Sequence, residues 1–251
     1  MPTPKPEIGK RLEHMTWKEA EVALRECEVV LIPLGARCKE HGPHLPLNND
    51  WIMAEYLARR VLEACDVIAV PTIEHGFYPA FVEYPGSIHI SLETSRDYLV
   101  DICRSLARFG PRKFYVLNTG VSTVRALAPA KVLLAKEGLV LEYTDMHQAG
   151  AAARESVRES EGGTHADEME TSMMLYMAPE IVNMKLAQKD FHADNGGGGL
   201  TRNPNSKIGT YSPTGSWGDP TLATREKGEV VVEALLKDVI SFIQTLSSDS
   251  A

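Results

Sequence analysis

The chain has 251 residues, of which 43% are hydrophobic and 24% charged, and its formal net charge is −8. This composition supports a packed core and excludes wholesale disorder and collagen-like repeats. The acidic balance argues against a broad basic face for nucleic acid. No apolar run reaches the roughly 18 residues of a membrane span, and the longest, 29–34, has the length of a strand. We therefore expect neither a nucleic-acid nor a membrane partner.

Two features indicate a cytoplasmic protein. Residues 1–10 carry prolines and charges but no apolar segment of the kind found in a signal peptide. The four cysteines, Cys27, Cys38, Cys65 and Cys103, are scattered without C-x-x-C spacing. Such spacing fits free thiols better than a disulfide framework.

Strand-sized apolar runs alternate with amphipathic stretches along the chain. In chain order we expect a helix at 17–27, a strand at 28–34, a helix at 51–62, a strand at 67–70, a helix opened by Ser91, a strand at 113–118, a helix at 124–136, a strand at 140–144, and helices at 168–176 and 227–246. Thr16 and Glu19 form a capping box for the first helix, and Asn49 or Asp50 is expected to cap the second.

The remaining segments read as loops and ends. Residues 148–164 and 192–218 are expected to be loops, and residues 1–10 and 247–251 to be flexible. The strand–helix alternation predicts one α/β domain, a three-layer sandwich in which helices cover both faces of a mainly parallel sheet. Ligands bind beyond the carboxyl ends of the strands in such sheets, so the loops after the strands should hold the site.

The loop at 35–50, after the first long strand, is the first site candidate. It brings Lys39, two carboxylates (Glu40 and Asp50) and two histidines (His41 and His44) into one short segment. Imidazole and carboxylate together suit zinc, manganese or iron. The alternative is an ordinary glycine- and proline-containing loop with exposed charges and a helix cap at Asp50.

A second candidate is the segment 165–172, where His165 precedes the start of a predicted helix. Carboxylates at this position favour the helix dipole, so capping is the competing interpretation. Glu168 and Glu170 point to different helix faces, and at most one of them readily joins a common site. A third segment, 212–220, is rich in turn residues and offers only weak indications of a site.

Together these segments resemble the creatininase (creatinine amidohydrolase) family. Its patterns E-Q-H-G-P-H-L-P-L-x-T-D, F-P-G-T, H-A-G-x-x-E-T-S and G-x-x-G-D-P are matched in order by 41–47 with Asp50, by 84–87, by 165–172 and by 215–220. The resemblance runs from about residue 31 to residue 228. It implies an α/β sandwich assembled as a homohexamer. It also implies two divalent metals and hydrolysis of a cyclic or linear amide C–N bond.

One of the two metal sites does not carry over. The Glu ligand of the first loop falls on Lys39, and the family's N-G-H-G-G-N falls on 118–123, where its His is absent. An ammonium beside a dication is costly, so we expect this site to be empty. A one-residue slip could bring Glu40 to the ligand position, but adjacent residues of an extended segment point to opposite sides.

The other metal site is retained in the resemblance. Its ligands would be His41, Asp50 and Glu170, which leaves an open position on one zinc, manganese or iron ion per chain. The catalytic His of the family falls on His165, with Glu170 and Lys39 beside it as further catalytic residues. Residues expected to contact the substrate are Glu40, His44, Tyr78, Phe81, Asn118, Trp217 and Asp219.

Three functions remain open at this point. The first is a metal-dependent hydrolase of a small-molecule amide, with His165 as general acid and base. The second is an isomerase, cyclase or lyase that needs no metal because Lys39 supplies the positive charge. The third is a non-catalytic family member, which a closed pocket or a Lys39–Asp50 salt bridge would mark. Aromatic residues at 77–84 predict a bulkier substrate than creatinine, unless they are ordinary core residues.

Overall fold

The structure is a computed structural model, and it describes residues 6–191 and 199–248. Its main sheet has five strands in the order β1-β3-β2-β4-β5, and every neighbouring pair is parallel. The strands are β1 (Lys10–Arg11), β2 (Val29–Leu34), β3 (Ile68–Ala69), β4 (Lys113–Asn118) and β5 (Val140–Tyr143). The predicted parallel sheet is therefore confirmed.

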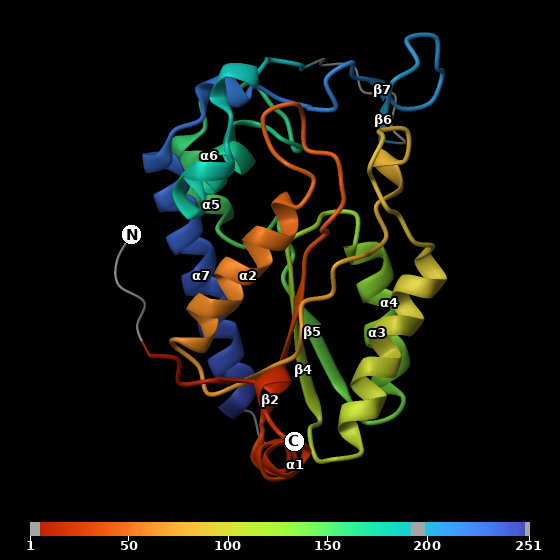
Figure 1. Cartoon of the computed structure of the whole chain (residues 1–251), viewed down its shortest axis with the longest axis vertical. Helices are drawn as coiled ribbons and strands as arrows, with labels where there is room; N and C mark the ends of the chain where they lie inside the picture. The colour runs from red at the N-terminus through yellow and green to blue at the C-terminus, as the bar shows by residue number, and fades with distance from the viewer. Residues whose placement is uncertain (1–5, 192–198, 249–251) are drawn as a thin grey trace.

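Helices form a layer on each face of this sheet (Figure 1). On one face lie α2 (Asn49–Leu62), α5 (Ala151–Val157), α6 (Glu168–Met177) and α7 (Arg225–Ser248); on the other lie α3 (Leu92–Ala107) and α4 (Val124–Ala135). The helix α1 (Trp17–Glu26) lies at the end of the molecule where the strands begin. The three-layer α/β sandwich is thus confirmed.

The strand β2 explains why the core has two halves. All six of its residues are buried. Successive side chains of a strand point to opposite faces, so Leu31 packs with Met53 and Leu235, whereas Ile32 packs with Phe114. A continuous apolar run is the pattern expected of a strand covered on both sides.

Several local predictions can be compared with the structure. Thr16 and Glu19 form the expected capping box of α1. Asn49 and Asp50 do not cap α2, because they lie inside its first turn and Asn48 occupies the N-cap position. The side chain of Asp50 is turned instead toward Lys39. The capping prediction was wrong because the helix begins at Asn49, which leaves both residues inside the first turn, and because the Asp50 carboxylate accepts from Lys39.

The segments expected to be irregular contain short elements. Residues 148–164 include α5, and the described part of 192–218 includes the parallel pair β6 (Leu200–Thr201) and β7 (Thr210–Tyr211). Lys10 pairs with Ile68 in the sheet, which differs from the flexibility expected at that residue. Residues 1–5, 192–198 and 249–251 lie outside the described residues. No helix in the described ranges is long and apolar enough to cross a bilayer.

Candidate active site

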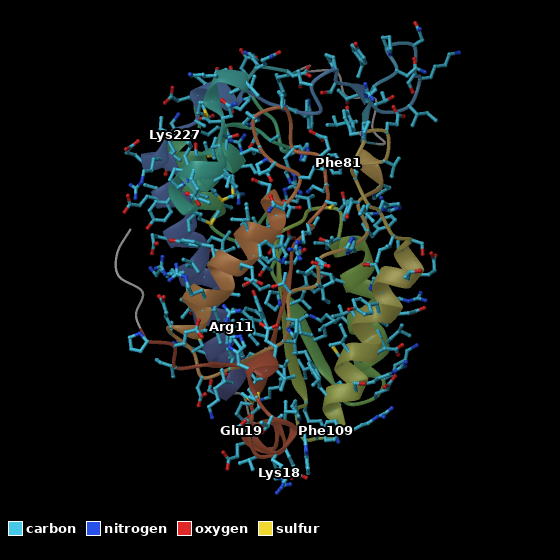
Figure 2. All side chains as sticks on the ribbon, in the orientation of Figure 1. Arg11, Lys18, Glu19, Phe81, Phe109 and Lys227 are labelled. Atoms are coloured by element: carbon cyan, nitrogen blue, oxygen red, sulfur yellow. The ribbon has the colours of Figure 1, made fainter. Side chains whose placement is uncertain are left out.

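A cavity of about 360 Å³ lies beyond the carboxyl ends of the strands. The loops after β2 and β4 and the start of α6 contribute to its wall. Figure 2 shows Phe81, one of the lining residues, at this end of the molecule, opposite the end that carries Lys18 and Phe109. Among the residues expected at the site, those lining the cavity are Lys39, Asp50, Tyr78, Phe81, His165, Glu170 and Trp217.

Lys39 and Asp50 form a buried ion pair in this wall. Lys39 Nζ lies 2.6 Å from Asp50 Oδ2, and the two residues are only 6% and 2% exposed. Burial opposes the charge on Lys39, but Asp50 and the neighbouring glutamates outweigh it and raise the pKa of Lys39. Burial likewise opposes the charge on Asp50, yet the cations Lys39 and His41 hold the pKa of Asp50 well below its usual range. Lys39, not Glu40, is therefore the residue that faces Asp50.

His41 lies between acceptors on both sides of its ring. Its Nδ1 is 2.8 Å from the Lys39 carbonyl oxygen, which only accepts, so Nδ1 donates. Its Nε2 is 2.7 Å from Asp50 Oδ1 and 3.4 Å from Glu170 Oε1. Burial is the largest influence and opposes protonation, but Asp50 and Glu170 together outweigh it, and the pKa of His41 is raised. An Nε2 that faces two carboxylates requires a cation, which is either its own proton or a metal ion.

The carboxylate of Glu170 is held in place by two donors. Asn49 Nδ2 lies 3.2 Å from Oε1, and the backbone N–H of Ala166 lies 2.7 Å from Oε2. Ala166 has a left-handed φ of 47°, which is unusual outside glycine and is typical of strained functional sites. Asp167 caps α6 by accepting from the Glu170 N–H, and burial raises the pKa of Asp167 to about 6.

His165 connects the two predicted segments. Its Nε2 lies 3.0 Å from Glu40 Oε2, and its Nδ1 lies 3.8 Å from Glu170 Oε2. The ring of Phe81 packs on it with a centroid separation of 4.1 Å. The other oxygen of Glu40, Oε1, accepts from the Gly42 N–H. Glu40 thus contacts His165, so that its carboxylate can orient the imidazole.

Donor atoms of His41, His165 and Glu170 lie within 4.8 Å of one another and could hold one metal ion. This group shares His41 and Glu170 with the set predicted from the sequence, and it has His165 where that set has Asp50. Two donors bonded to a tetrahedral zinc at about 2.0–2.2 Å lie roughly 3.4 Å apart. The 3.4 Å between His41 Nε2 and Glu170 Oε1 matches this separation.

The other family metal site does not fit this chain. The positions of two of its ligands are held by Lys39 and Gly120, and neither residue offers a side-chain donor suited to a dication. The ammonium of Lys39 also neutralises Asp50, the third ligand of that site.

Three residues expected to contact the substrate form hydrogen bonds to other residues of the protein instead. His44 is buried with Nε2 2.8 Å from Thr171 Oγ1, and burial lowers the pKa of His44 to about 4. Asn118 braces the loop after β4 through bonds to Gly120 and to the Thr144 carbonyl oxygen. Asp219 accepts from the Thr221 N–H and caps a short 3₁₀ turn.

The aromatic residues at 77–84 serve both of the roles considered. Tyr78 and Phe81 line the cavity. They also pack in a small apolar cluster with Tyr84 and Leu200. The Tyr84 hydroxyl donates to the Ser212 carbonyl oxygen at 2.9 Å, which ties this cluster to the turn-rich segment 212–220.

Two arginines that sequence reasoning did not select also line the cavity, Arg154 in α5 and Arg158 just after it. The sequence predicts a loop over 148–164, and a loop gives no reason to place these two arginines at a common site. Their spacing of four residues, which places side chains on one helix face, was the available signal.

The chain is similar to one protein family and to several characterised enzymes. Residues 13–243 match the model of the family described as "Creatininase: Creatinine amidohydrolase". A mycofactocin precursor peptide peptidase of Mycobacterium ulcerans is 31% identical over 226 residues, covering 85% of this chain and 84% of its own. The 3-dehydro-scyllo-inosose hydrolase of Thermotoga maritima is 29% identical over 255 residues, covering 91% and 80%. The creatinine amidohydrolase of Pseudomonas putida is 26% identical over 250 residues, covering 92% and 94%.

Solved structures agree on the fold. The structure described as "Creatininase Mn" superposes with a TM-score of 0.78 at 22% identity, covering 96% of this chain and all (100%) of its own. A mutant creatininase of the "Zn-Zn type" superposes with a TM-score of 0.76 at 22% identity, covering 98% and 100%.

Proposed function

Because the chain belongs to the creatininase family and is an enzyme of the hydrolase kind, we propose that it hydrolyses an amide C–N bond of a small molecule with one divalent metal ion. The observation that carries this proposal is that donor atoms of His41, His165 and Glu170 lie within 4.8 Å of one another, and that two of these residues, His165 and Glu170, line the cavity. The activities named for the relatives support C–N hydrolysis, since two of them are an amidohydrolase and a peptidase.

His41 and Glu170 are the proposed ligands common to both candidate sets, and Asp50 is the third. Asp50 Oδ1 lies 2.7 Å from the same His41 nitrogen that faces Glu170, so these two atoms must separate to about 3.4 Å to share an ion. When bound, a divalent cation polarises a carbonyl group and lowers the pKa of a water molecule. This assignment leaves His165 free for proton transfer, whereas a ligand set that includes His165 does not.

His165 is the proposed general acid and base. It takes the proton of the attacking water as the C–O bond forms, and it gives a proton to the nitrogen as the C–N bond breaks. Glu40, 3.0 Å from Nε2, orients the ring during both transfers. The Lys39 ammonium adds positive charge beside the carbonyl oxygen, where negative charge develops. An acid and an amine leave the site.

Elemental analysis of protein purified without chelator tests this proposal. We expect about one divalent ion per chain, lost in His41→Ala and in Glu170→Gln and kept in the matched control His14→Ala, whose side chain is exposed. His165→Ala should keep the ion but release no amine from a panel of lactams and N-acyl amino acids. Loss of the ion in His165→Ala would replace Asp50 by His165 in the ligand set.

Other results would contradict the proposal. Two ions per chain would mean that Lys39 does not exclude the second metal. Activity without any ion would favour an isomerase, cyclase or lyase in which Lys39 acts in place of a metal, an alternative supported by its pairing with Asp50. A chain with neither metal nor activity would be a non-catalytic member of the family, whose expected mark, the Lys39–Asp50 salt bridge, is present beside a cavity of about 360 Å³.

Cytoplasmic location and homohexameric assembly are further parts of the proposal. The four cysteines are free thiols, which supports a reducing compartment. Light scattering of the purified protein tests the assembly, and a monomeric mass would rule out the hexamer.

A further inference from the structure

Two guanidinium groups lie in the wall of the same cavity as the proposed catalytic residues. Arg154 belongs to α5 and Arg158 follows directly after its last residue. Both line the cavity together with His165 and Glu170. Neither residue has a part in the proposed chemistry, so their presence needs a separate explanation.

Arg154 is half-buried and makes its hydrogen bonds to neutral groups. Its Nη2 donates to the carbonyl oxygens of Met146 at 2.8 Å and Ala149 at 3.1 Å. Within the described ranges no carboxylate forms an ion pair with it. Burial lowers the pKa of Arg154, as expected of a cation that lacks a close anion. By contrast, Arg60, also half-buried, makes two bonds to Glu233 at 2.7 and 2.9 Å.

Arg158 is similarly undersatisfied. Its only ion pair among the described residues joins Nε to Oε1 of Glu155 at 3.3 Å, and that carboxylate belongs to a side chain that is 70% exposed. Although this buried Nε lies 3.3 Å from the Glu155 oxygen, it makes no well-directed hydrogen bond in the described part of the chain. Native proteins rarely leave a buried donor unpaired, because an unmade bond costs free energy.

Asp167 is an acidic residue that lines the cavity together with the two arginines. It attracts both guanidinium groups electrostatically, and its Oδ1 accepts from the Glu170 N–H at the start of α6. In the described part of the chain it forms an ion pair with neither arginine. Two cations therefore line the cavity with one shared anion, and planar guanidinium groups match the two oxygens of a carboxylate.

We propose that the substrate carries a carboxylate that Arg154 and Arg158 bind, while its amide group lies against His165 and Glu170. This inference rests on the proposed function and adds the class of substrate, an N-acyl amino acid or a lactam bearing a carboxylate. A molecule of that size suits the cavity of about 360 Å³.

Binding rather than turnover tests the inference. The probes are N-acetylglycine and 5-oxoproline, each compared with its neutral carboxamide by titration calorimetry on the full chain as purified. We expect each carboxylate to bind at least about tenfold more tightly than its carboxamide. Arg158→Gln should reduce this preference to less than about threefold, and Arg158→Lys should retain part of it. Arg104→Gln, which removes an exposed arginine paired with Glu137, is the matched control and should leave the preference unchanged.

Equal binding of carboxylates and carboxamides by the unaltered protein would overturn the inference. So would a preference that survives both Arg158→Gln and Arg154→Gln in variants whose melting temperature shows that they fold. Tighter binding of phosphoglycolate than of either carboxylate would replace the carboxylate by a phosphate. A protein that binds carboxylates through these arginines but hydrolyses nothing would refute the proposed function and leave this inference standing.

Discussion

Lys39 Nζ lies 2.6 Å from Asp50 Oδ2, and both groups are buried beside the candidate metal ligands. The pair places a fixed positive charge in the site and engages one oxygen of Asp50. The second oxygen, Oδ1, remains directed at His41. Asp50 therefore joins the lysine to the imidazole, and changes at Lys39 should affect both stability and metal binding.

Lys39→Met should lower the free energy of unfolding by about 3 kcal/mol, because it leaves a carboxylate buried without its ammonium partner. Urea unfolding at pH 7.5 measures this loss. Arg104→Met, which removes an exposed ion pair with Glu137, is the control and should cost less than about 1 kcal/mol. Equal losses in the two variants would show that the Lys39–Asp50 pair contributes no more than a surface pair.

Lys39→Glu alone should not add a second metal ion, because Gly120 still stands at the position of the family's third-strand His. Adding Gly120→His to the same chain should raise the metal content by about one ion. Elemental analysis of the single and double variants gives the answer. A second ion in Lys39→Glu alone would contradict the alignment of ligands on which the prediction of an empty site depends.

His44→Gln should flatten the pH dependence of stability in acid. The folded pKa of His44 is about 4, below the unfolded value of about 6.5, so the unfolded chain binds more protons between these limits. The stabilisation is complete above about pH 6.5 and is lost as the pH falls toward 4. Unfolding free energies at pH 7.5 and 5.0 should differ less in His44→Gln than in the unaltered chain. Parallel profiles would show that His44 is protonated in the folded protein.

Gly215→Ala should disturb Glu40 as well as the backbone. Gly215 has a φ of 84°, and a Cβ there would collide with the Glu40 carboxylate. Gly138→Ala is the matched control, since Gly138 has a φ of 72° and nothing within 4 Å of the added atom. Gly138→Ala should cost about 1 kcal/mol from backbone strain, and Gly215→Ala should cost clearly more in the same urea unfolding measurement. Equal costs would place Glu40 away from Gly215.

Much of the fold was predictable because its signals are local. The capping residues Thr16 and Glu19 and the apolar run of β2 define elements through neighbours in the chain. Strand β1 has no such signal, since its two residues, Lys10 and Arg11, are charged and become a strand only by pairing with β3. Helix α5 is short, and its stability depends on contacts with α7 that no local pattern reports.

The sequence predicted which residues lie at the site better than it predicted how their side chains are oriented. The resemblance to the family's motifs selected His41, Asp50, His165 and Glu170, and the structure brings these side chains together. The sequence motifs could not show that Asn118 donates to the Thr144 carbonyl oxygen, because Thr144 is distant in the chain. Which oxygen of Asp50 meets Lys39 likewise depends on three-dimensional packing.

The ammonium of Lys39 supplies a positive charge that does not depend on the supply of metal ions. A chelator can strip an ion from a protein, and a shift in supply can exchange one ion for another. A charge carried on a side chain is covalently part of the protein, so neither a chelator nor ion exchange removes it. The positive charge of Lys39 is therefore present in every molecule of the protein, and a shortage of trace metals does not remove it.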